Sequence, residues 1–207
     1  MASSFDRSER RWLFAATVGA AVSLVAFASV ISGRGLVAWD APVAARLVAL
    51  PPLPARVVDV VGGTFVVAPL VALAAVFLWT TGRRWGAARV VLLPAAGEIA
   101  TLAVKTLVAR PRPAGSYATG YSFPSGHATD AAIMACLLAW FAFREPRGRA
   151  LVVALVALAL GWAALVAAMR VTLGVHYASD VLGGLGMGLA IAGAGLALLG
   201  RAQRAHR

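Results

Sequence analysis

Residues 150–169 read ALVVALVALALGWAALVAAM, a run without a single charged side chain. A helix of ~20 apolar residues is long enough to cross the hydrocarbon core of a bilayer. The rest of the chain has the same character, since 61% of its 207 residues are hydrophobic and only 13% are charged. This composition lies outside the range of soluble domains and predicts an integral membrane protein.

Similar apolar runs flank this one on both sides. The six expected spans are 12–32, 56–80, 85–109, 126–143, 150–169 and 179–200. Between the first two, residues 36–50 mix apolar side chains with Asp40 and Arg46 and then meet the prolines of 51–54, which favours a short interfacial amphipathic helix. Because no repeat or linker divides the chain, we expect one all-α domain over residues 1–207, built as a six-helix transmembrane bundle.

The basic residues predict the orientation of this bundle. If six spans alternate, twelve arginines fall on one side of the membrane: Arg7, Arg10, Arg11, Arg83, Arg84, Arg89, Arg144, Arg147, Arg149, Arg201, Arg204 and Arg207. Cytoplasmic loops collect Lys and Arg, so both termini are expected in the cytoplasm. Membrane topology thus explains the net charge of +11 better than nucleic-acid binding does.

Other features fit this plan. Tryptophans fall near the same ends of the spans, as an interfacial belt requires: Trp12, Trp79, Trp85 and Trp140. A cleaved signal peptide is the alternative for the first run, but its apolar stretch is longer than a typical signal core.

The glycines of 183–195 in the last span predict close packing inside the bundle. Cys136, the only cysteine, lies in an apolar run and is expected to be a small buried side chain.

Polar residues gather in the connection after the third span, on the side opposite the twelve arginines. It contains Lys105, the only lysine of the chain, then Arg110 and Arg112, and finally Pro-Ser-Gly-His at 124–127. A helix that begins near Ser125 presents free backbone N–H groups and the positive end of its dipole. These features together favour an anion-binding site.

The connection after the fifth span faces the same side. It contains Arg170, His176 and Asp180. The histidine and the aspartate are four residues apart, so a helix beginning there would place them on one face. A carboxylate that accepts a hydrogen bond from one imidazole nitrogen leaves the other nitrogen as a nucleophile. Any one of these residues alone has a structural explanation, such as snorkelling cations or a helix cap.

Taken together, the motifs resemble those of the type 2 phosphatidic acid phosphatase (PAP2) superfamily of membrane-bound lipid phosphatases. That family has three separated pieces, and all three occur here in order between Lys105 and Asp180. They are Lys105 with Arg112-Pro113, then Pro124-Ser125-Gly126-His127, then Arg170 with His176 and Asp180. Met169 stands where the family pattern has a serine.

The resemblance implies a role for each residue. His176 would attack phosphorus to form a phosphohistidine, Asp180 would hold its ring, and His127 would protonate the leaving oxygen. The phosphoryl oxygens would be held by substrate-binding residues: Lys105, Arg112, Ser125, Gly126 and Arg170. Three cations can neutralise a phosphate dianion, so we expect no metal and no cofactor.

Three neighbouring ionisable residues have open roles. Glu98 lies in the third span and can tune Lys105 or pair with another helix, and Asp130 can modulate His127 or contact water. Arg110 is the expected extra cation for a second phosphate or headgroup, or else an interfacial anchor.

The expected substrate is a lipid phosphomonoester or pyrophosphate reached from the outer membrane face. Polyprenyl pyrophosphates such as undecaprenyl pyrophosphate, phosphatidic acid and phosphatidylglycerol phosphate all fit, with a slight preference for a cell-wall lipid carrier. Lipid phosphotransfer with the same histidine chemistry is the alternative reaction. A vanadate haloperoxidase fits less well, because those enzymes are soluble proteins and this chain consists mostly of membrane spans. A small membrane transporter also fits less well, because a transport path needs polar residues at mid-membrane.

Overall fold

The computed structural model describes residues 7–33, 35, 37–47, 57–58, 60–144 and 148–206. Within these ranges the regular secondary structure is entirely helical. The helices are α1 (Arg7–Ser32), α2 (Asp40–Leu47), α4 (Thr64–Thr80), α5 (Arg84–Val108), α6 (Gly126–Arg144), α7 (Arg149–Thr172) and α8 (Ala178–Ala205). The all-α prediction is therefore confirmed for the described part of the chain.

Five of these helices, α1, α5, α6, α7 and α8, are long and apolar enough to cross a membrane. They correspond to the expected spans 12–32, 85–109, 126–143, 150–169 and 179–200. Their outer surfaces are apolar, as lipid contact requires, with Ile99 exposed by 71% and Leu158 by 71%. The chain is thus a multi-pass membrane protein.

The expected second span, 56–80, is only partly confirmed. The helix α4 in this span begins only at Thr64, because Gly62 and Gly63 form a turn and a bend before it. Residues 56 and 59 lie outside the described residues. A count of six crossings remains a prediction.

The expected interfacial helix over 36–50 is confirmed as a helix only in part. It is helical as α2 only over Asp40–Leu47, and residues 36 and 48–54 lie outside the described residues. This helix packs against α7 and α8, and Asp40 at its start is buried. Asp40 is therefore part of the protein interior, whereas Ala41 and Pro42 of the same turn are exposed, and the position of the helix relative to a bilayer remains a prediction.

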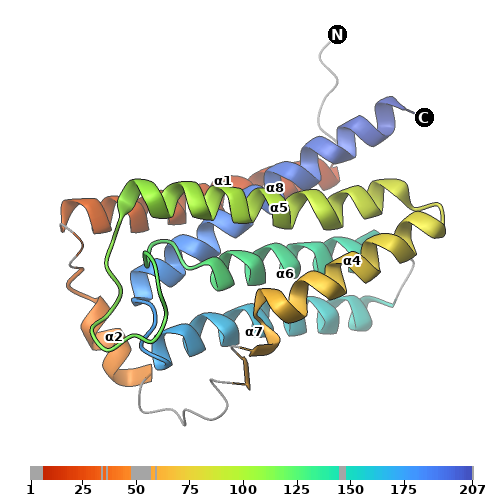
Figure 1. Ribbon diagram of the computed structural model, residues 1–207. Coiled ribbons are helices and arrows are strands. Elements are labelled where there is room, and N and C mark those ends of the chain that lie inside the picture. The colour runs from red at the N-terminus through yellow and green to blue at the C-terminus, as the bar shows by residue number, and fades with distance from the viewer. Residues whose placement is uncertain are drawn as a thin grey trace.

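The two ends of the bundle differ in what they carry. Figure 1 shows α2 and the loop between α5 and α6 at one end, whereas α1 begins and α8 finishes at the other. There Arg204 near the end of α8 forms an ion pair with Glu9 in the first turn of α1. Arg147 and Arg207, which are also expected at this end, lie outside the described residues.

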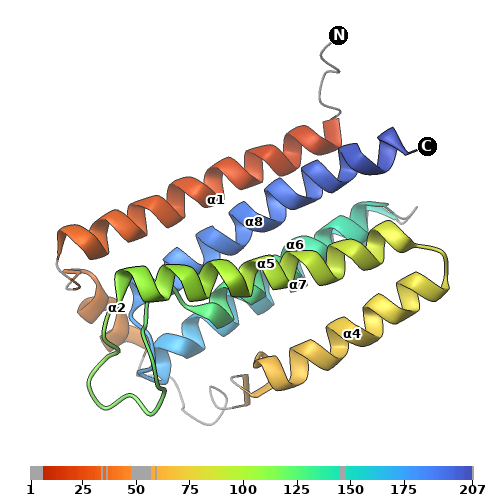
Figure 2. The same ribbon diagram turned by 45° about the horizontal axis from the view of Figure 1, so that its top comes forward.

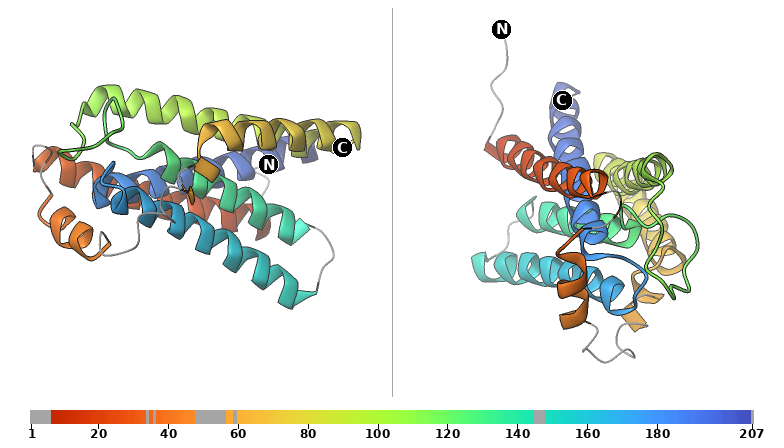
Figure 3. Two further views of the ribbon diagram at one scale, coloured as in Figure 1. Left: turned by 60° about the horizontal axis from the view of Figure 1, so that its bottom comes forward. Right: turned by 90° about the vertical axis from the view of Figure 1, so that its left-hand side faces the viewer.

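Helix α8 is the centre of the bundle. It lies alongside α1 in Figure 2 and occupies the middle of the end-on view in Figure 3, where it is surrounded by the other long helices. Its glycines face different neighbours. A Cβ atom added at Gly186 would lie 2.6 Å from the backbone nitrogen of Ser23 in α1, and one added at Gly193 would lie 2.5 Å from the carbonyl oxygen of Trp12.

The opposite face of α8 packs just as closely against α6. Cβ atoms added at Gly184 and Gly188 would collide with the carbonyl oxygens of Ser125 and Thr129. The predicted small-residue surface therefore serves packing inside the bundle. Cys136 is buried in the adjoining cluster of α5, α6 and α8, also as expected.

The glycine packing gives a stability prediction. We expect Gly188→Ala to lower the melting temperature in detergent, because overpacking at such a contact costs about 1–3 kcal/mol. Gly200→Ala in the same helix is the matched control, since a Cβ atom there meets nothing within 4 Å. It should be neutral or slightly stabilising, because alanine favours a helix by about 1 kcal/mol over glycine. Equal melting temperatures for the two variants would contradict this account of the α6–α8 contact.

Candidate active site

The three predicted motifs meet at one cavity of about 540 Å³. Its wall includes six of the eight predicted site residues: Lys105, Arg112, Gly126, His127, Arg170 and His176. They come from the end of α5, the loop 109–125, the start of α6, the end of α7 and the connection before α8. We call this space the site cavity. The other two predicted residues, Ser125 and Asp180, lie directly behind its wall and are fully buried.

His176 lies at the base of the site cavity and is only 3% exposed. Its Nδ1 is 3.3 Å from Oδ2 of Asp180, and its Nε2 is 3.2 Å from a terminal nitrogen of Arg112. With the Nδ1 proton donated to the carboxylate, Nε2 carries the lone pair and points toward the cations. The geometry therefore has the form of a buried nucleophile with an orienting acid.

Burial lowers the pKa of His176 from its ordinary 6.5 to about 4. The hydrogen bond and charge of Asp180 act in the opposite direction, and the charges of Arg112 and Arg170 add to the lowering. Burial prevails because the ring is almost completely removed from water. A neutral imidazole at neutral pH follows, and only the neutral form has a lone pair to offer.

Asp180 is held in the first turn of α8. Its Oδ2 accepts a hydrogen bond of 2.9 Å from the backbone N–H of Tyr177, the residue that caps the helix. His176 lies just before the helix, so it meets Asp180 through the geometry of the helix start. The expected proximity of the two side chains is confirmed, although the expected shared helical face is not.

The cations Lys105 and Arg112 are oriented by backbone carbonyl groups. Lys105 Nζ donates to the carbonyl oxygen of Tyr121 at 3.2 Å, and Arg112 donates to that of Val175 at 2.7 Å and to that of Thr119 at 3.0 Å. Partial burial lowers the pKa of Arg112, but a guanidinium keeps its charge at neutral pH. None of these three hydrogen bonds cancels the positive charge, because each acceptor is a neutral carbonyl group.

The start of α6 is tied to the start of α8. The backbone N–H of Ser125 donates to the carbonyl oxygen of Asp180 at 3.0 Å, so the Pro-Ser-Gly-His segment is fixed relative to His176. The Ser125 hydroxyl is buried and has no hydrogen-bond partner among the described residues. Met169, by contrast, packs into an apolar cluster with Ala163 and Val166, away from the site cavity. The residue that departs from the family pattern is thus not part of the cavity wall.

Sequence reasoning missed a network behind Asp180. Arg110 is 2% exposed, and one of its terminal nitrogens is 2.5 Å from Oδ1 of Asp180 while the other is 2.7 Å from Oδ2 of Asp40. Asp40 also accepts hydrogen bonds of 2.7 Å from the backbone N–H and the hydroxyl of Ser179. The carbonyl oxygen of Gly35 accepts from the remaining nitrogen, Nε, at 3.0 Å and from the terminal nitrogen that also contacts Asp40 at 2.8 Å.

This network replaces both roles expected for Arg110. All three of its nitrogens are bonded inside the protein, so it is placed neither for a second phosphate or headgroup nor as an anchor at the membrane interface. Asp40 and Ser179 carried no motif that would have revealed them. Only the proximity of α2 and α8 makes them partners.

Glu98 and Asp130 form a second polar group on the wall of the site cavity. Glu98 of α5 and Asp130 of α6 are joined by a side-chain hydrogen bond. Glu98 therefore pairs with another helix, which was one of the two alternatives for it. Across the described ranges, no group of three or more His, Cys, Asp or Glu side chains is arranged to hold a metal ion.

Comparison with known protein families identifies the family to which the chain belongs. The sequence profile of the PAP2 superfamily matches residues 86–204, which is more than half of the chain and contains all three motifs. Among curated protein sequences, none matches this chain.

Two solved structures share the fold. A transmembrane PAP2 type phosphatidylglycerolphosphate phosphatase from Bacillus subtilis superposes with a TM-score of 0.74 at 20% identity, covering 92% of this chain and 98% of the other. LpxE from Aquifex aeolicus superposes with a TM-score of 0.55 at 23% identity, covering 74% of this chain and 91% of the other. With the profile match, the fold and the three motifs in agreement, the chain belongs to the PAP2 superfamily and is a phosphatase of the PAP2 type.

Proposed function

We propose that the protein hydrolyses a lipid phosphomonoester or pyrophosphate through a phosphohistidine on His176. The observation that carries this proposal is the buried pair of His176 and Asp180, 3.3 Å apart, facing a cavity lined by three cations. Phosphoryl transfer needs an aligned nucleophile and neutralisation of charge on the equatorial oxygens. Lys105, Arg112 and Arg170 supply the second requirement.

The reaction proceeds in two displacements. Nε2 of His176 attacks phosphorus as the bond to the leaving oxygen breaks, and His127 gives its proton to that oxygen. A water molecule then attacks the phosphohistidine, His127 takes its proton, and the bond between phosphorus and nitrogen breaks to release phosphate. Asp180 holds the imidazole and stabilises its positive charge throughout. No step requires a metal ion.

The phosphoryl oxygens have further donors within reach of the cavity wall. The buried Ser125 hydroxyl and the amide of Gly126 lie at the start of α6, where the helix dipole favours an anion. In the free protein Arg112 donates to Nε2 of His176. A phosphoryl group that enters the cavity would take over this donor and free the nucleophile.

A lipid substrate fits the position of the cavity. Leu102 lines the cavity and is 65% exposed on the outer surface of α5, so an apolar tail can lie along this helix while the phosphate enters. Polyprenyl pyrophosphates such as undecaprenyl pyrophosphate, phosphatidic acid and phosphatidylglycerol phosphate all have such a tail. The Bacillus relative is named for the last of these.

We further propose that the site cavity faces the outer side of the cell membrane and that both termini are cytoplasmic. The beginning of α1 and the end of α8 lie at the end of the bundle opposite the site. That end also carries most of the described arginines outside the motifs, as the positive-inside rule predicts.

The first prediction from the proposed function concerns the reaction itself. Purified wild type should release phosphate from a panel of polyprenyl and glycerolipid phosphates in the presence of a chelator, whereas His176→Ala should lose this activity by a factor of about 10⁴ or more. His206→Ala is the matched control, because His206 lies at the far end of α8. Equal turnover in wild type and His176→Ala would refute the mechanism. Transfer of phosphate to an added lipid alcohol, without release to water, would assign phosphotransfer in its place.

The second prediction concerns the ionisation of His176. Because burial lowers its pKa to about 4, its ring should remain neutral at about pH 5.5, where an ordinary histidine is mostly charged. Nitrogen-15 NMR of histidine-labelled protein, with the signal assigned by its loss in His176→Ala, measures this directly. A change of charge near pH 6.5 would show that the ring is in contact with water.

The third prediction concerns the network behind the nucleophile. Asp40→Asn should weaken the hold on Arg110 and thereby disturb Asp180 and the imidazole. A small misplacement of a catalytic group costs up to ~100-fold in rate, so we expect kcat to fall tenfold to a hundredfold while KM changes little. Arg46→Gln on the exposed face of the same helix is the control and should leave kcat unchanged. A fall in stability without a fall in the kcat of the folded fraction would assign Asp40 to folding alone.

A further inference from the structure

A second cavity lies at the end of the bundle opposite the active site. Its volume is about 310 Å³, and its polar wall consists of Arg83, Arg84, Arg89, Arg144 and Gln203. We call it the arginine cavity. Along α5 it begins ~30 Å from Lys105, because a helix rises 1.5 Å per residue, and this distance equals the thickness of a bilayer core.

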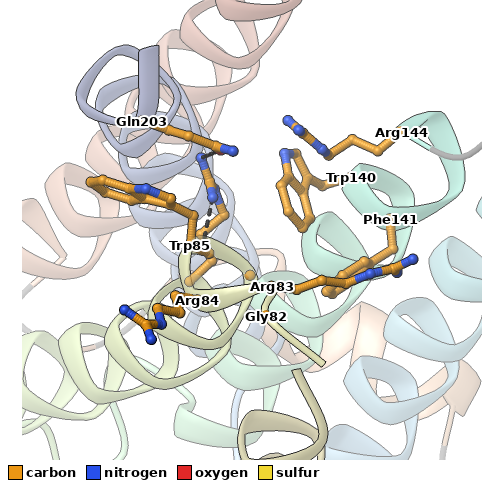
Figure 4. Close-up of a pocket in the computed structure, with 10 residues that line it drawn as sticks. Gly82, Arg83, Arg84, Trp85, Trp140, Phe141, Arg144 and Gln203 are labelled. Carbon is orange, nitrogen blue, oxygen red and sulfur yellow. Dashed lines mark hydrogen bonds between the residues drawn. The ribbon is translucent and has the colours of Figure 1, made fainter. Parts of the chain in front are cut away.

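The arginine cavity is built between three helices. Figure 4 shows Trp140, Phe141 and Arg144 of α6 on one side of it and Trp85 and Gln203, from α5 and α8, on the other. Two indole rings thus frame a cationic space at the level where aromatic residues meet lipid headgroups.

Arg89 is the most unusual residue of this cavity. Its side chain is fully buried, and its terminal nitrogens donate to the carbonyl oxygen of Trp85 at 2.7 Å and to Oε1 of Gln203 at 3.2 Å. Its Nε is buried without a hydrogen-bond partner in the described structure. The guanidinium carbon lies 4.6 Å from the centre of the Trp140 ring. A buried cation with only neutral partners is costly unless an anion joins it.

Arg144 adds a second charge to the same space. Its guanidinium carbon lies 5.0 Å from the centre of the Trp140 ring, so Arg89 and Arg144 contact one indole. No carboxylate lines the cavity among the described residues. Glu9, which lines the adjoining cavity, forms an ion pair with Arg204. Glu145 lies outside the described residues.

Membrane topology alone does not account for Arg89. An arginine that serves only to keep a loop in the cytoplasm stays in water, as the exposed Arg149 at the same end of the bundle does. Arg89 instead lies inside α5, a full turn beyond its first residue, where it is removed from solvent. Its position indicates a site that holds negative charge.

An apolar groove adjoins the arginine cavity. It has a volume of about 470 Å³ between α6 and α7, and its wall includes Leu138, Phe141, Leu158 and Trp162. Phe141 lines both spaces, so a charged pocket continues into an apolar one along the outer surface of the bundle. Leu138 is 52% and Leu158 71% exposed there, as acyl-chain contact requires.

We propose that the arginine cavity binds the phosphate of an anionic phospholipid from the adjacent leaflet, with one acyl chain in the apolar groove. Basic pockets between transmembrane helices recognise such headgroups through charge and hydrogen bonds. The bound phosphate complements Arg89 and Arg144 and thereby holds α5, α6 and α8 together. This lipid is distinct from the substrate, because it occupies the opposite end of the bundle.

The test measures binding of phosphatidylglycerol to purified full-length protein in a neutral detergent, by native mass spectrometry and by the shift in melting temperature. Phosphatidylcholine is the zwitterionic control lipid, and inorganic phosphate is the control for a free anion. We expect one retained phosphatidylglycerol molecule, and we expect Arg144→Gln to weaken its binding about fivefold. Arg149→Gln removes the same charge at the same end outside the cavity and should have no effect.

Arg89→Gln should weaken binding at least as much as Arg144→Gln. If this variant does not fold, the exposed Arg144 still decides the question. Equal weakening by Arg144→Gln and Arg149→Gln would overturn the proposal in favour of diffuse surface charge. Stabilisation by inorganic phosphate equal to that by phosphatidylglycerol would overturn the lipid assignment. Phosphatidylglycerol binding that appears only in Glu145→Gln would show that this carboxylate already occupies the cavity and would also overturn it.

Discussion

The buried carboxylate of Asp180 is the interaction on which the site depends. It is 0% exposed, and a charge so far from water persists only when charged and hydrogen-bonding partners surround it. Here the partners are the guanidinium of Arg110, the amide of Tyr177 and the imidazole of His176. Arg110 lies in the loop after α5, whereas His176 and Tyr177 are adjacent residues just before α8. Satisfying one carboxylate therefore joins these two segments and fixes the geometry of the proposed nucleophile, His176. Through Arg110 the same carboxylate connects to Asp40 and the start of α2.

This network forms only because α8 approaches its neighbours closely. Gly184 allows the backbone of α8 to contact the carbonyl group of Ser125, and the amide of Ser125 in turn donates to the carbonyl of Asp180. Gly186 and Gly19 serve the same purpose between α8 and α1. In a membrane, where apolar side chains gain little by leaving lipid, such backbone contact is a main source of helix association. The packing of α8 is thus also what aligns the two histidine-bearing motifs.

The sequence predicted the features that depend on local pattern. Apolar runs located five spans, but helices α1 and α8 extend beyond them to Arg7 and Ala205, because backbone hydrogen bonds continue where hydrophobicity stops. The shortened second span follows from the turn at Gly62 and Gly63, which a hydropathy argument overlooks because glycine is neither strongly apolar nor charged.

In the site, too, the sequence predicted only those residues that belong to a local motif. Residues within the three motifs were found and meet at the site cavity, whereas the partners of Asp180 outside the motifs were not. Asp40 is 140 positions away from Asp180 along the chain. It lies on a helix whose sequence pattern resembled that of an interfacial segment. Arg110 carried the right charge for a ligand contact, and only its burial reveals that this charge belongs to the interior. Pairings of this kind depend on tertiary proximity and leave no trace in spacing.

The distribution of partners among the cations explains how the site can attract a dianion. Asp40 and Asp180 both direct an oxygen to Arg110, which lies outside the cavity. Lys105 and Arg112 are held by carbonyl oxygens, which orient a cation but do not cancel its charge. Had these two cations been oriented by carboxylates, an entering phosphate would have had to displace them at the cost of a buried ion pair. Placing Asp40 and Asp180 in the layer behind His176 keeps the proposed nucleophile oriented and leaves the charges of Lys105 and Arg112 available to an entering phosphate.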